Sequence, residues 1–567
     1  MEFKKHFRRL TVSQSIGRDI SAVILLFSLL MVIVVGVFPG TPINDDWAYA
    51  RILEEFIHTG RFIPLNWIGM NYFTQTVMAY PFIKVFGGGW GTLHLFGLVM
   101  GVGVLALTLV WMAQQGASRG AAFAVALAWM ANPIFVGLSG SFMTDVPFLG
   151  LLLLSFVFAN RSLQEEQSLG RFVLFILTVV TALLLRQPAL WLTIAFAVAC
   201  YDRKRGWTNV RLLIPFLCAV AAQLLFDYWV SQTGAQLEAR QYLTWRIIDH
   251  IKRLLQGDSG LWRFVLSNGI DFPSYVAMMM IPLLPFWFQG VRAYWSDAMP
   301  TQRRVLIVAF AIGCLFAGLA GIPPFRKHNV IGPLGLGPLT LRDGWLVESW
   351  SLVNVPVAFW VGIGCLTVLA GGMILAVWVG YVQREKAWKA PEFRMLVVFM
   401  VLYSAPFILT DFFDRYTLPV LLCVATVLSK ISGQKKRAIS IFSWIWLLAW
   451  VAVATIAAHD YQAWQHAKWR AAQDLLAQGI DPKRIDGGFE FNGYYLYGRV
   501  SPPPGKSWWW VADDEYLIAF SNEPFPNYRQ LSVYRVDGLL PTTPKHVLTL
   551  RRKDPSLRGS RFSNSIP

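Results

Sequence analysis

The feature that most constrains this chain is a succession of apolar segments, each close to the thickness of a lipid bilayer in length. A helix that crosses the hydrocarbon core needs roughly 20 largely apolar residues. About thirteen segments of the 567-residue sequence meet or approach this length: 20–38, 93–113, 121–138, 146–160, 172–185, 187–200, 212–230, 272–288, 305–322, 352–380, 395–410, 416–429 and 438–458. A mean hydropathy of +0.47 agrees with this pattern. We therefore predict an all-α polytopic membrane protein.

The two short segments 172–185 and 187–200 decide the sidedness of everything that follows them. They form either one long helix with Arg186 at its middle or two helices that meet at Arg186-Gln187-Pro188. With two helices, the later cytoplasmic loops carry 15 Lys and Arg in 49 residues, whereas the opposite loops carry 9 in 78. Because cytoplasmic loops are enriched in Lys and Arg, we favour two helices, which place Arg186 at the outer surface.

The net charge of +17 follows from the same topology. A strongly basic chain otherwise suggests a nucleic-acid partner, because phosphate attracts dense positive charge. With the N-terminus in the cytoplasm, thirteen crossings put the C-terminus outside. The cytoplasmic segments then carry +15 of the net charge, and the outer loops between helices are balanced. The excess of positive charge therefore reflects the orientation of the chain in the membrane, and we expect no nucleic-acid partner.

Two domains are expected. Residues 1–458 form a transmembrane domain with long outer juxtamembrane loops, and residues 459–567 form a small extracytoplasmic α+β domain. The second domain begins with a helical pattern over 460–478 and continues with strand-like runs at Tyr516–Phe520 and Leu531–Val536. The five cysteines lie in apolar runs and the eight histidines are scattered, so neither a disulfide framework nor hydrolase or redox chemistry is indicated.

The first candidate site directly follows the first apolar segment. Asn44, Asp45 and Asp46 stand between Pro42 and a helical pattern. Asn or Asp at this place also acts as a helix N-cap, and one such residue suffices. Consecutive helical residues point about 100° apart, so the two carboxylates have different surroundings. We expect one to cap the helix and the other to face a cavity.

A second carboxylate, Asp145, begins the apolar helix that follows Ser141-Phe-Met-Thr144. Its structural alternative is again an N-cap. On the same side of the membrane as Asp45 and Asp46, it supplies a carboxylate that orients an acceptor hydroxyl. Asp45 and Asp145 are also the candidate ligands for a divalent cation. No other cofactor is indicated, and the metal requirement stays open.

The cationic candidates are Arg186 and Arg415, the latter followed by Tyr416. A planar guanidinium suits a phosphate group because it donates two parallel hydrogen bonds. The structural alternatives are snorkelling at a helix end and, for Arg415, pairing with Asp414. Together with the outer-face carboxylates, these arginines make an acid/base and anion-binding set.

Five motifs carry a resemblance to a known superfamily: NDDWAYA (44–50), TGRFIPLNW (59–67), FMTDVP (142–147), LLLRQPAL (183–190) and DRYTLP (414–419). At these residues the chain resembles the integral-membrane glycosyltransferases of the GT-C fold, in the superfamily of protein O-mannosyltransferases and lipid A aminoarabinose transferase. The resemblance covers roughly the first 200 residues and the region 411–420.

That superfamily transfers a sugar with inversion from a polyprenyl-phosphate carrier, on the outer face of the bacterial inner membrane or in the endoplasmic reticulum lumen. The resemblance implies a polyprenyl-phosphate-sugar donor, a lipid, glycan or protein acceptor, contact with membrane lipid, and a role in glycan biosynthesis of the cell envelope. The site residues it implies are Asp46 or Asp45 as the base, Asp145 as the second acidic residue, and Arg186 and Arg415, with Tyr416, at the carrier phosphate.

One departure concerns the donor phosphate. Aminoarabinose-transferase-like members carry Lys-Pro-Pro after the first juxtamembrane helix, where this chain has Gly69-Met-Asn-Tyr-Phe73. Other cations must therefore bind the donor. In the C-terminal domain, 486–493 and Trp508–Trp510 are candidates for contact with a glycan, and the tryptophans equally suit the bilayer surface.

A lipid-linked glycan transporter or flippase is the alternative function. Such a protein places its polar groups along a path through the membrane, whereas here only Asp227 is intramembrane and the other candidates gather on one face. A non-catalytic membrane assembly subunit is the third option. We predict a polyprenyl-phosphate-sugar-dependent hexosyl- or pentosyltransferase.

Overall fold

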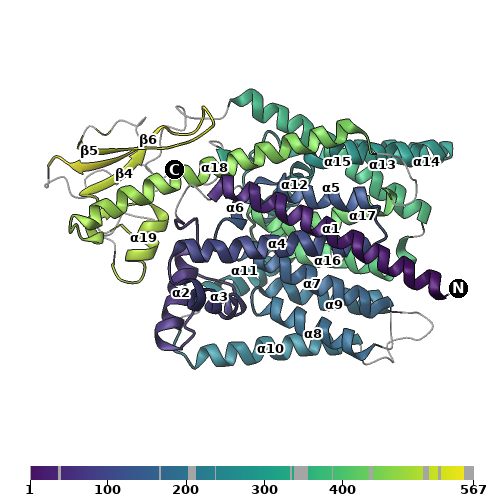
Figure 1. Cartoon of the computed structure of the whole chain (residues 1–567), viewed down its shortest axis with the longest axis horizontal. Helices are drawn as coiled ribbons and strands as arrows, with labels where there is room; N and C mark the ends of the chain where they lie inside the picture. The colour runs from purple at the N-terminus through teal and green to yellow at the C-terminus, as the bar shows by residue number, and fades with distance from the viewer. Residues whose placement is uncertain are drawn as a thin grey trace.

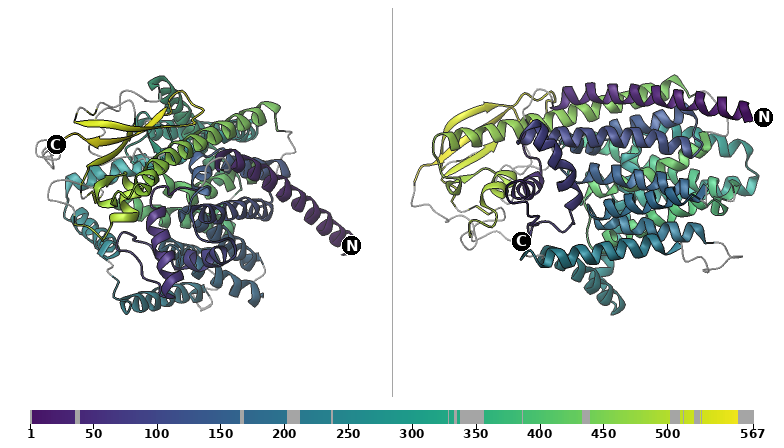
Figure 2. Two further views of the ribbon diagram at one scale, coloured as in Figure 1. Left: turned by 60° about the vertical axis from the view of Figure 1, so that its left-hand side comes forward. Right: turned by 60° about the horizontal axis from the view of Figure 1, so that its bottom comes forward.

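The structure is a computed structural model of the chain, and it shows a mostly helical protein. Most helices run roughly parallel in one bundle, and a small β-sheet lies at one end (Figure 1). The N-terminus lies at the opposite end from the sheet (Figure 2). The residues that the structure describes are 2–35, 40–164, 168–201, 212–235, 238–327, 329–332, 335–336, 356–385, 387–432, 439–501, 510–511, 513–520, 525 and 527–554.

Within the described residues, every segment expected to span the membrane coincides with a helix or with two consecutive helices; residues 36–38, 352–355 and 438 of these segments lie outside the described ranges. The helices concerned are α1 (Glu2–Val35), α4 (Trp90–Gln114), α5 (Arg119–Met130), α6 (Pro133–Ser139), α7 (Asp145–Gln164), α8 (Leu169–Leu183), α9 (Leu190–Cys200), α10 (Ile214–Ser231), α12 (Ser259–Met279), α13 (Leu284–Asp297), α14 (Pro300–Leu319), α15 (Val357–Glu385), α16 (Pro391–Leu409), α17 (Leu418–Ser432) and α18 (Ile441–Ala477).

Length and composition alone identify fewer helices able to cross the membrane than the thirteen predicted, and they do not confirm that count. Eight helices of the described chain are long and apolar enough to span, or up to ten if each of two bent pairs is one span. In the first pair, α5 and α6 meet at 68°. The bend has a local cause, because Asn132 accepts the N–H groups of Ile134 and Phe135 and Pro133 begins α6. The thirteen-span count remains a prediction.

The break predicted near Arg186 is present. Helix α8 ends at Leu183, a short 3-10 helix η1 (Gln187–Ala189) follows, and α9 begins at Leu190. Pro188 lies in η1, where its missing N–H and fixed φ suit a helix start. The segment is therefore two short apolar helices.

The long loop predicted after the first span folds into two juxtamembrane helices, α2 (Asp46–Thr59) and α3 (Phe73–Phe86). Both lie at the sheet end of the bundle (Figure 1). The first two turns of α2 are buried almost throughout, from Asp46 to Leu53, and Gly60 ends the helix in the left-handed conformation with a φ of 70°. The next long loop, which the sequence predicts to lie on the outer side, contains α11 (Glu238–Leu255).

The last membrane helix does not stop at residue 458. Helix α18 continues to Ala477, so secondary structure is unbroken across the boundary proposed between the two domains. Its extension packs against a four-stranded sheet ordered β3-β4-β6-β5. The strands are β3 (Ile485–Asp486), β4 (Tyr516–Phe520), β5 (Tyr528–Arg535) and β6 (His546–Arg552), with β3 parallel to β4 and the other neighbours antiparallel.

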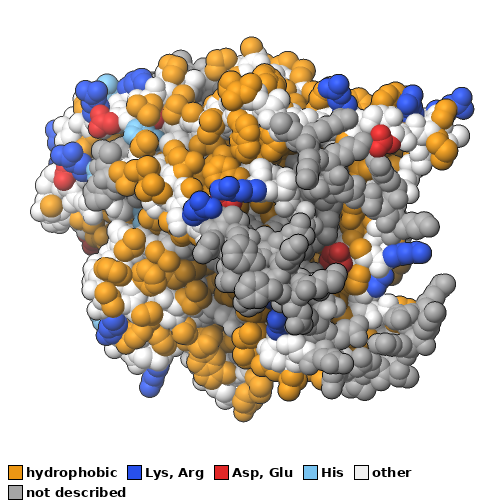
Figure 3. All heavy atoms as spheres, turned by 45° about the vertical axis from the view of Figure 1, so that its right-hand side comes forward, with side chains coloured by type: hydrophobic (Ala, Val, Ile, Leu, Met, Phe, Trp, Pro, Cys, Tyr) orange, Lys and Arg blue, Asp and Glu red, His pale blue; other side chains and the backbone are white. Residues whose placement is uncertain are grey.

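The outer surface of the bundle is apolar. Hydrophobic side chains cover much of the described surface on the face shown in Figure 3, and charged side chains are sparse there. Exposed Leu224 and Leu225 on α10 and Ile307 and Val308 on α14 belong to this surface. A lipid bilayer covers such a surface at no hydrophobic cost, so the protein is a multi-pass membrane protein.

Candidate functional site

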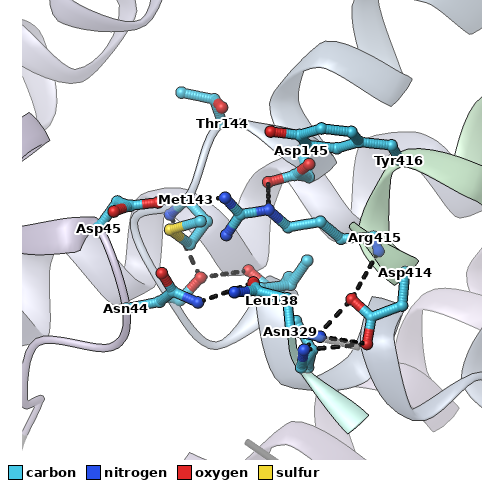
Figure 4. Close-up of polar contacts among 12 residues, drawn as sticks. Asn44, Asp45, Leu138, Met143, Thr144, Asp145, Asn329, Asp414, Arg415 and Tyr416 are labelled. Atoms are coloured by element: carbon cyan, nitrogen blue, oxygen red, sulfur yellow. Dashed lines mark hydrogen bonds and ion pairs between the residues drawn. The ribbon is translucent and has the colours of Figure 1, made fainter. Parts of the chain in front are cut away.

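Four separate segments meet at the sheet end of the bundle to form one polar site. They are the loop that leads into α2, the first turn of α7, the residue before η1, and the 3-10 helix η6 (Asp414–Thr417) between α16 and α17. Figure 4 shows the Arg415 guanidinium between Asp45 and Asp145, with Tyr416 beside them. Candidates that lie between 41 and 370 residues apart in the chain are therefore brought together.

Asp45 is the carboxylate that faces this site. Although it stands at the N-cap position of α2, its side chain makes no capping hydrogen bond. Instead, Oδ1 accepts the indole N–H of Trp67 at 2.9 Å, and Oδ2 accepts Arg415 Nη2 at 3.1 Å. The Asp45 side chain is 15% exposed. A carboxylate has about four lone-pair sites, so Asp45 keeps the capacity to accept another hydrogen.

Asp46 has a different environment and is completely buried. Its two oxygens accept the backbone N–H groups of Ile43 at 3.2 Å and Phe142 at 3.1 Å, and His94 Nε2 lies 3.8 Å from Oδ2. Burial raises the pKa of Asp46 well above its ordinary value, which the two backbone hydrogen bonds only partly offset. Asp46 thereby ties the start of α2 to the loop that precedes α7.

Asp145 and Arg186 form a buried ion pair. Arg186 Nη1 donates to Asp145 Oδ1 at 2.6 Å, and both side chains are less than 10% exposed. The guanidinium of Arg186 also lies over the ring of Tyr416, 5.1 Å from its centroid. The helix break at η1 is what brings Arg186 to the first turn of α7.

Arg415 connects the two carboxylates. Besides its hydrogen bond to Asp45, its Nε lies 3.9 Å from Asp145 Oδ2. Burial disfavours its charged form, but the Asp145 and Asp45 carboxylates and Tyr416 outweigh burial and raise the pKa of Arg415. In the part of the chain that the structure describes, Nε and Nη1 of Arg415 have no hydrogen-bond partner. Two buried donors of a cationic group thus remain available to an anion.

Asp414 does not pair with the Arg415 guanidinium, as the structural alternative supposed. Its carboxylate accepts the backbone N–H groups of Asn329, Val330, Ile331 and Arg415 at 2.8 to 3.2 Å. Burial raises the pKa of Asp414, and these hydrogen bonds oppose the shift. Asp414 therefore fixes both the 329–331 loop and the backbone of Arg415.

The charged set does not fit a divalent cation as it is arranged. No group of three or more His, Cys, Asp or Glu side chains within the described ranges is placed to hold a metal ion. Asp45 and Asp145 each face the Arg415 guanidinium, and Arg186 takes one Asp145 oxygen. The space near both carboxylates is therefore occupied by positive charge.

An aromatic cluster lies beside Asp45. Trp67 and Trp47 pack against Trp510, with ring centroids 5.0 and 5.3 Å from it, and Tyr497 joins the same cluster. Trp67 is 37% exposed and holds Asp45 through its indole N–H. Of the predicted Trp508–Trp510 run, only Trp510 belongs to the described residues.

Sequence reasoning missed several residues that hold this site. Trp67 stands in one of the recognised motifs, which assigns it no role, and nothing in the sequence marks Asn329. Glu490, which accepts the backbone N–H of Asn44, comes from a segment considered only for glycan contact. No local pattern marks these residues, because each acts on a partner far away in the sequence.

The fold and the site together define a class: a multi-pass membrane protein with a buried acid/arginine site at one end of its helical bundle. Over 375 residues, the chain is 23% identical to undecaprenyl phosphate-α-4-amino-4-deoxy-L-arabinose arabinosyl transferase 2 of Pseudomonas fluorescens. The match covers 64% of this chain and 65% of that relative's length. The resemblance inferred from the motifs is thus confirmed. No protein-family model matches the chain.

Two solved structures are similar at low identity. The chain is 14% identical to ArnT from Cupriavidus metallidurans bound to undecaprenyl phosphate, with 83% of this chain and 75% of that chain covered and a TM-score of 0.39. It is also 14% identical to the archaeal oligosaccharyltransferase AglB from Archaeoglobus fulgidus in complex with an inhibitory peptide and a dolichol-phosphate, with 86% and 60% covered and a TM-score of 0.38.

Proposed function

We propose that the protein is a GT-C-like glycosyltransferase that moves a sugar from a polyprenyl-phosphate carrier to an acceptor hydroxyl on the outer face of the membrane. One observation carries the proposal: Arg415 lies 3.1 Å from the Asp45 carboxylate and still has two buried donors without a partner among the described residues. A base for an acceptor and a cation for a leaving phosphate are therefore adjacent.

Asp45 is the proposed general base. It forms an ion pair with Arg415 and retains lone pairs for the acceptor hydroxyl. As the acceptor oxygen bonds to the anomeric carbon, the hydroxyl proton passes to Asp45, and the bond from that carbon to the carrier phosphate breaks with its electron pair on the phosphate oxygen. A single displacement of this kind inverts the configuration at the anomeric carbon.

Arg415 is the proposed principal ligand of the carrier phosphate. Its Nε and Nη1 are directed donors that stabilise the negative charge on the departing phosphate. Arg186 and Tyr416 support it, since Arg186 lies over the Tyr416 ring and neutralises Asp145. This arrangement supplies the cations that the missing Lys-Pro-Pro motif would otherwise provide.

The position of the site at the end of the helical bundle suits a donor whose lipid tail stays in the bilayer. The juxtamembrane helices α2 and α3 lie at the same end of the bundle as the site (Figure 1). With the N-terminus in the cytoplasm and thirteen crossings, this end faces outward, and in a bacterium the protein lies in the inner membrane with its C-terminal domain in the periplasm. The acceptor is a lipid, glycan or protein hydroxyl of the cell envelope.

The test is transfer by the purified full-length protein in lipid nanodiscs. The donors are undecaprenyl-phosphate-linked hexoses and pentoses, including 4-amino-4-deoxy-L-arabinose, and the acceptors are envelope lipids and glycans. We expect release of undecaprenyl phosphate together with a glycosylated product of inverted configuration. Movement of labelled donor across the membrane without cleavage of the sugar would instead establish the transporter or flippase alternative.

A further inference from the structure

A buried ion pair lies between the C-terminal extension of α18 and α19 (Phe489–Leu496). Lys468 on α18 donates to Glu490 Oε2 in the first turn of α19. The exposed fractions of the two side chains are 1% and 0%. Two charges held out of water need excellent geometry to offset their desolvation. Such a pair therefore calls for an explanation other than stability alone.

Glu490 also reaches the loop that carries the proposed base. Its Oε1 accepts the backbone N–H of Asn44 at 3.1 Å and the side-chain amide of Gln465 at 2.9 Å. Asn44 directly precedes Asp45. One carboxylate thus serves three donors, and Lys468 neutralises its charge.

Asn44 adopts a left-handed backbone conformation that is held from two sides. Its φ is +54°, a region that Asn enters more readily than most other residues with a Cβ. On the other side, its Nδ2 donates to Asn329 Oδ1 at 2.9 Å, and Asn329 is held in turn by Asp414. The turn at Asn44 directs the Asp45 side chain to Trp67 and Arg415 rather than to the α2 cap.

We propose that Glu490, neutralised by Lys468, is a positioning residue for the Asp45 carboxylate. Through the Asn44 N–H, it fixes the turn from which Asp45 reaches the acceptor hydroxyl. The inference rests on the proposed function, in which Asp45 is the base. It also assigns the C-terminal domain a part in the transfer step.

Other contacts hold the C-terminal domain against α2 without Glu490. Arg51 Nη1 donates to the Tyr497 carbonyl at 2.8 Å, and Tyr494 donates to Glu54 at 2.8 Å. Gly493 packs against the indole of Trp47. Removal of the Glu490 carboxylate therefore leaves α19 docked, and its effect on the base is separable from loss of the domain.

The test compares two double variants, Glu490→Gln/Lys468→Met and Glu490→Leu/Lys468→Met. Both remove the buried charges and keep side chains of similar size. Only the first retains an oxygen that accepts the N–H groups of Asn44 and Gln465, and its new amide N–H₂ takes the place of Oε2 beside the side chain at position 468. Size-exclusion chromatography in detergent gives the folded fraction, and kcat is expressed per folded molecule.

We expect the Glu490→Gln/Lys468→Met variant to keep kcat within about 3-fold of the wild type and the Glu490→Leu/Lys468→Met variant to lose about 10²-fold, the effect of a misplaced catalytic group. The KM for donor stays unchanged in both, because Asp414 holds Arg415 separately. Equal kcat values in the two folded variants overturn the proposal. A wild type that transfers no sugar overturns the proposed function instead.

The single variant Glu490→Gln keeps the test decisive if the leucine variant does not fold. It retains the acceptor for Asn44 but leaves Lys468 without its counter-ion. We expect lower stability and a kcat per folded molecule near that of the wild type. A kcat that falls as far as that of Asp45→Asn contradicts the positioning role.

Discussion

Asp45 and Asp46 are neighbours in sequence with different roles in the structure. Asp45 faces an arginine and an indole N–H and keeps lone pairs for another donor. Asp46 is completely buried, and its two oxygens accept the backbone N–H groups of Ile43 and Phe142. The environment of each carboxylate, rather than its position in the motif, decides which one is available to an acceptor.

The variant Asp46→Asn tests this division of roles. An amide keeps one acceptor oxygen and turns an N–H₂ group toward the second backbone N–H, so we expect a loss of about 1–3 kcal/mol in stability. Turnover per folded molecule stays within about 10-fold of the wild type, because Asp46 does not reach the acceptor. Chemical unfolding and single-turnover assays measure the two quantities. A folded variant with no turnover would show instead that Asp46 is the base.

The raised pKa of Asp46 predicts that the difference in stability between the wild type and Asp46→Asn depends on pH. Asp46 is a carboxyl group whose pKa is higher in the folded than in the unfolded protein. The stability that such a group contributes is fully present below its unfolded pKa, and that contribution is lost as the pH rises through its folded pKa. The advantage of the wild type over Asp46→Asn should therefore be constant below pH 3.8 and shrink at higher pH. Thermal unfolding of both proteins across a pH series checks this. An advantage that grows with pH would contradict the raised pKa.

Arg415→Lys separates the geometry of the guanidinium from its charge. Lysine keeps one positive charge but loses the planar fork, so one or more charge-assisted hydrogen bonds to the donor phosphate are lost. We expect donor affinity to fall by about 10- to 10²-fold, from about 1.5–3 kcal/mol per charged hydrogen bond. Arg263→Lys on the exposed side of α12 is the matched control. Equal donor affinity in both variants would remove Arg415 from the phosphate site.

At the scale of elements, the contact between α19 and α2 holds the C-terminal domain against the helix that begins at the site. A Cβ added at Gly493 would lie 2.3 Å from Trp47 Cε2. We expect Gly493→Ala to cost about 1–3 kcal/mol through overpacking. Gly170→Ala on α8 meets nothing within 4 Å and should be neutral or slightly stabilising. Differential scanning fluorimetry compares the two, and equal midpoints would contradict the packing.

Elements with a local signal could be predicted from the sequence. Arg186-Gln-Pro188 marks the break between α8 and α9, and the strand-like run Tyr516–Phe520 is β4. The bend between α5 and α6 also has a local signal, Asn132 followed by Pro133, which the single span 121–138 overlooked. The contact from Glu490 to Asn44 spans 446 residues of sequence. It could not be predicted, because only the tertiary fold brings the two residues together.

At the scale of the whole molecule, the proposed orientation predicts where each terminus lies. The N-terminus and the sheet are at opposite ends of the bundle (Figure 2), and the basic N-terminal segment favours the cytoplasm. We expect alkaline phosphatase fused to the C-terminus to be active and a C-terminal green fluorescent protein to be dark. The reverse pattern of reporter activity would invert the orientation and place the site in the cytoplasm.

The central claim is that Asp45 removes the acceptor proton while Arg415 holds the carrier phosphate. The most direct measurement is single-turnover transfer from a polyprenyl-phosphate-linked sugar by Asp45→Asn, with donor binding measured on the same folded sample. The amide keeps the shape of the carboxylate but is not a base, so we expect a rate lower by about 10²- to 10⁴-fold with the donor still bound. Transfer at the wild-type rate by Asp45→Asn would contradict the account.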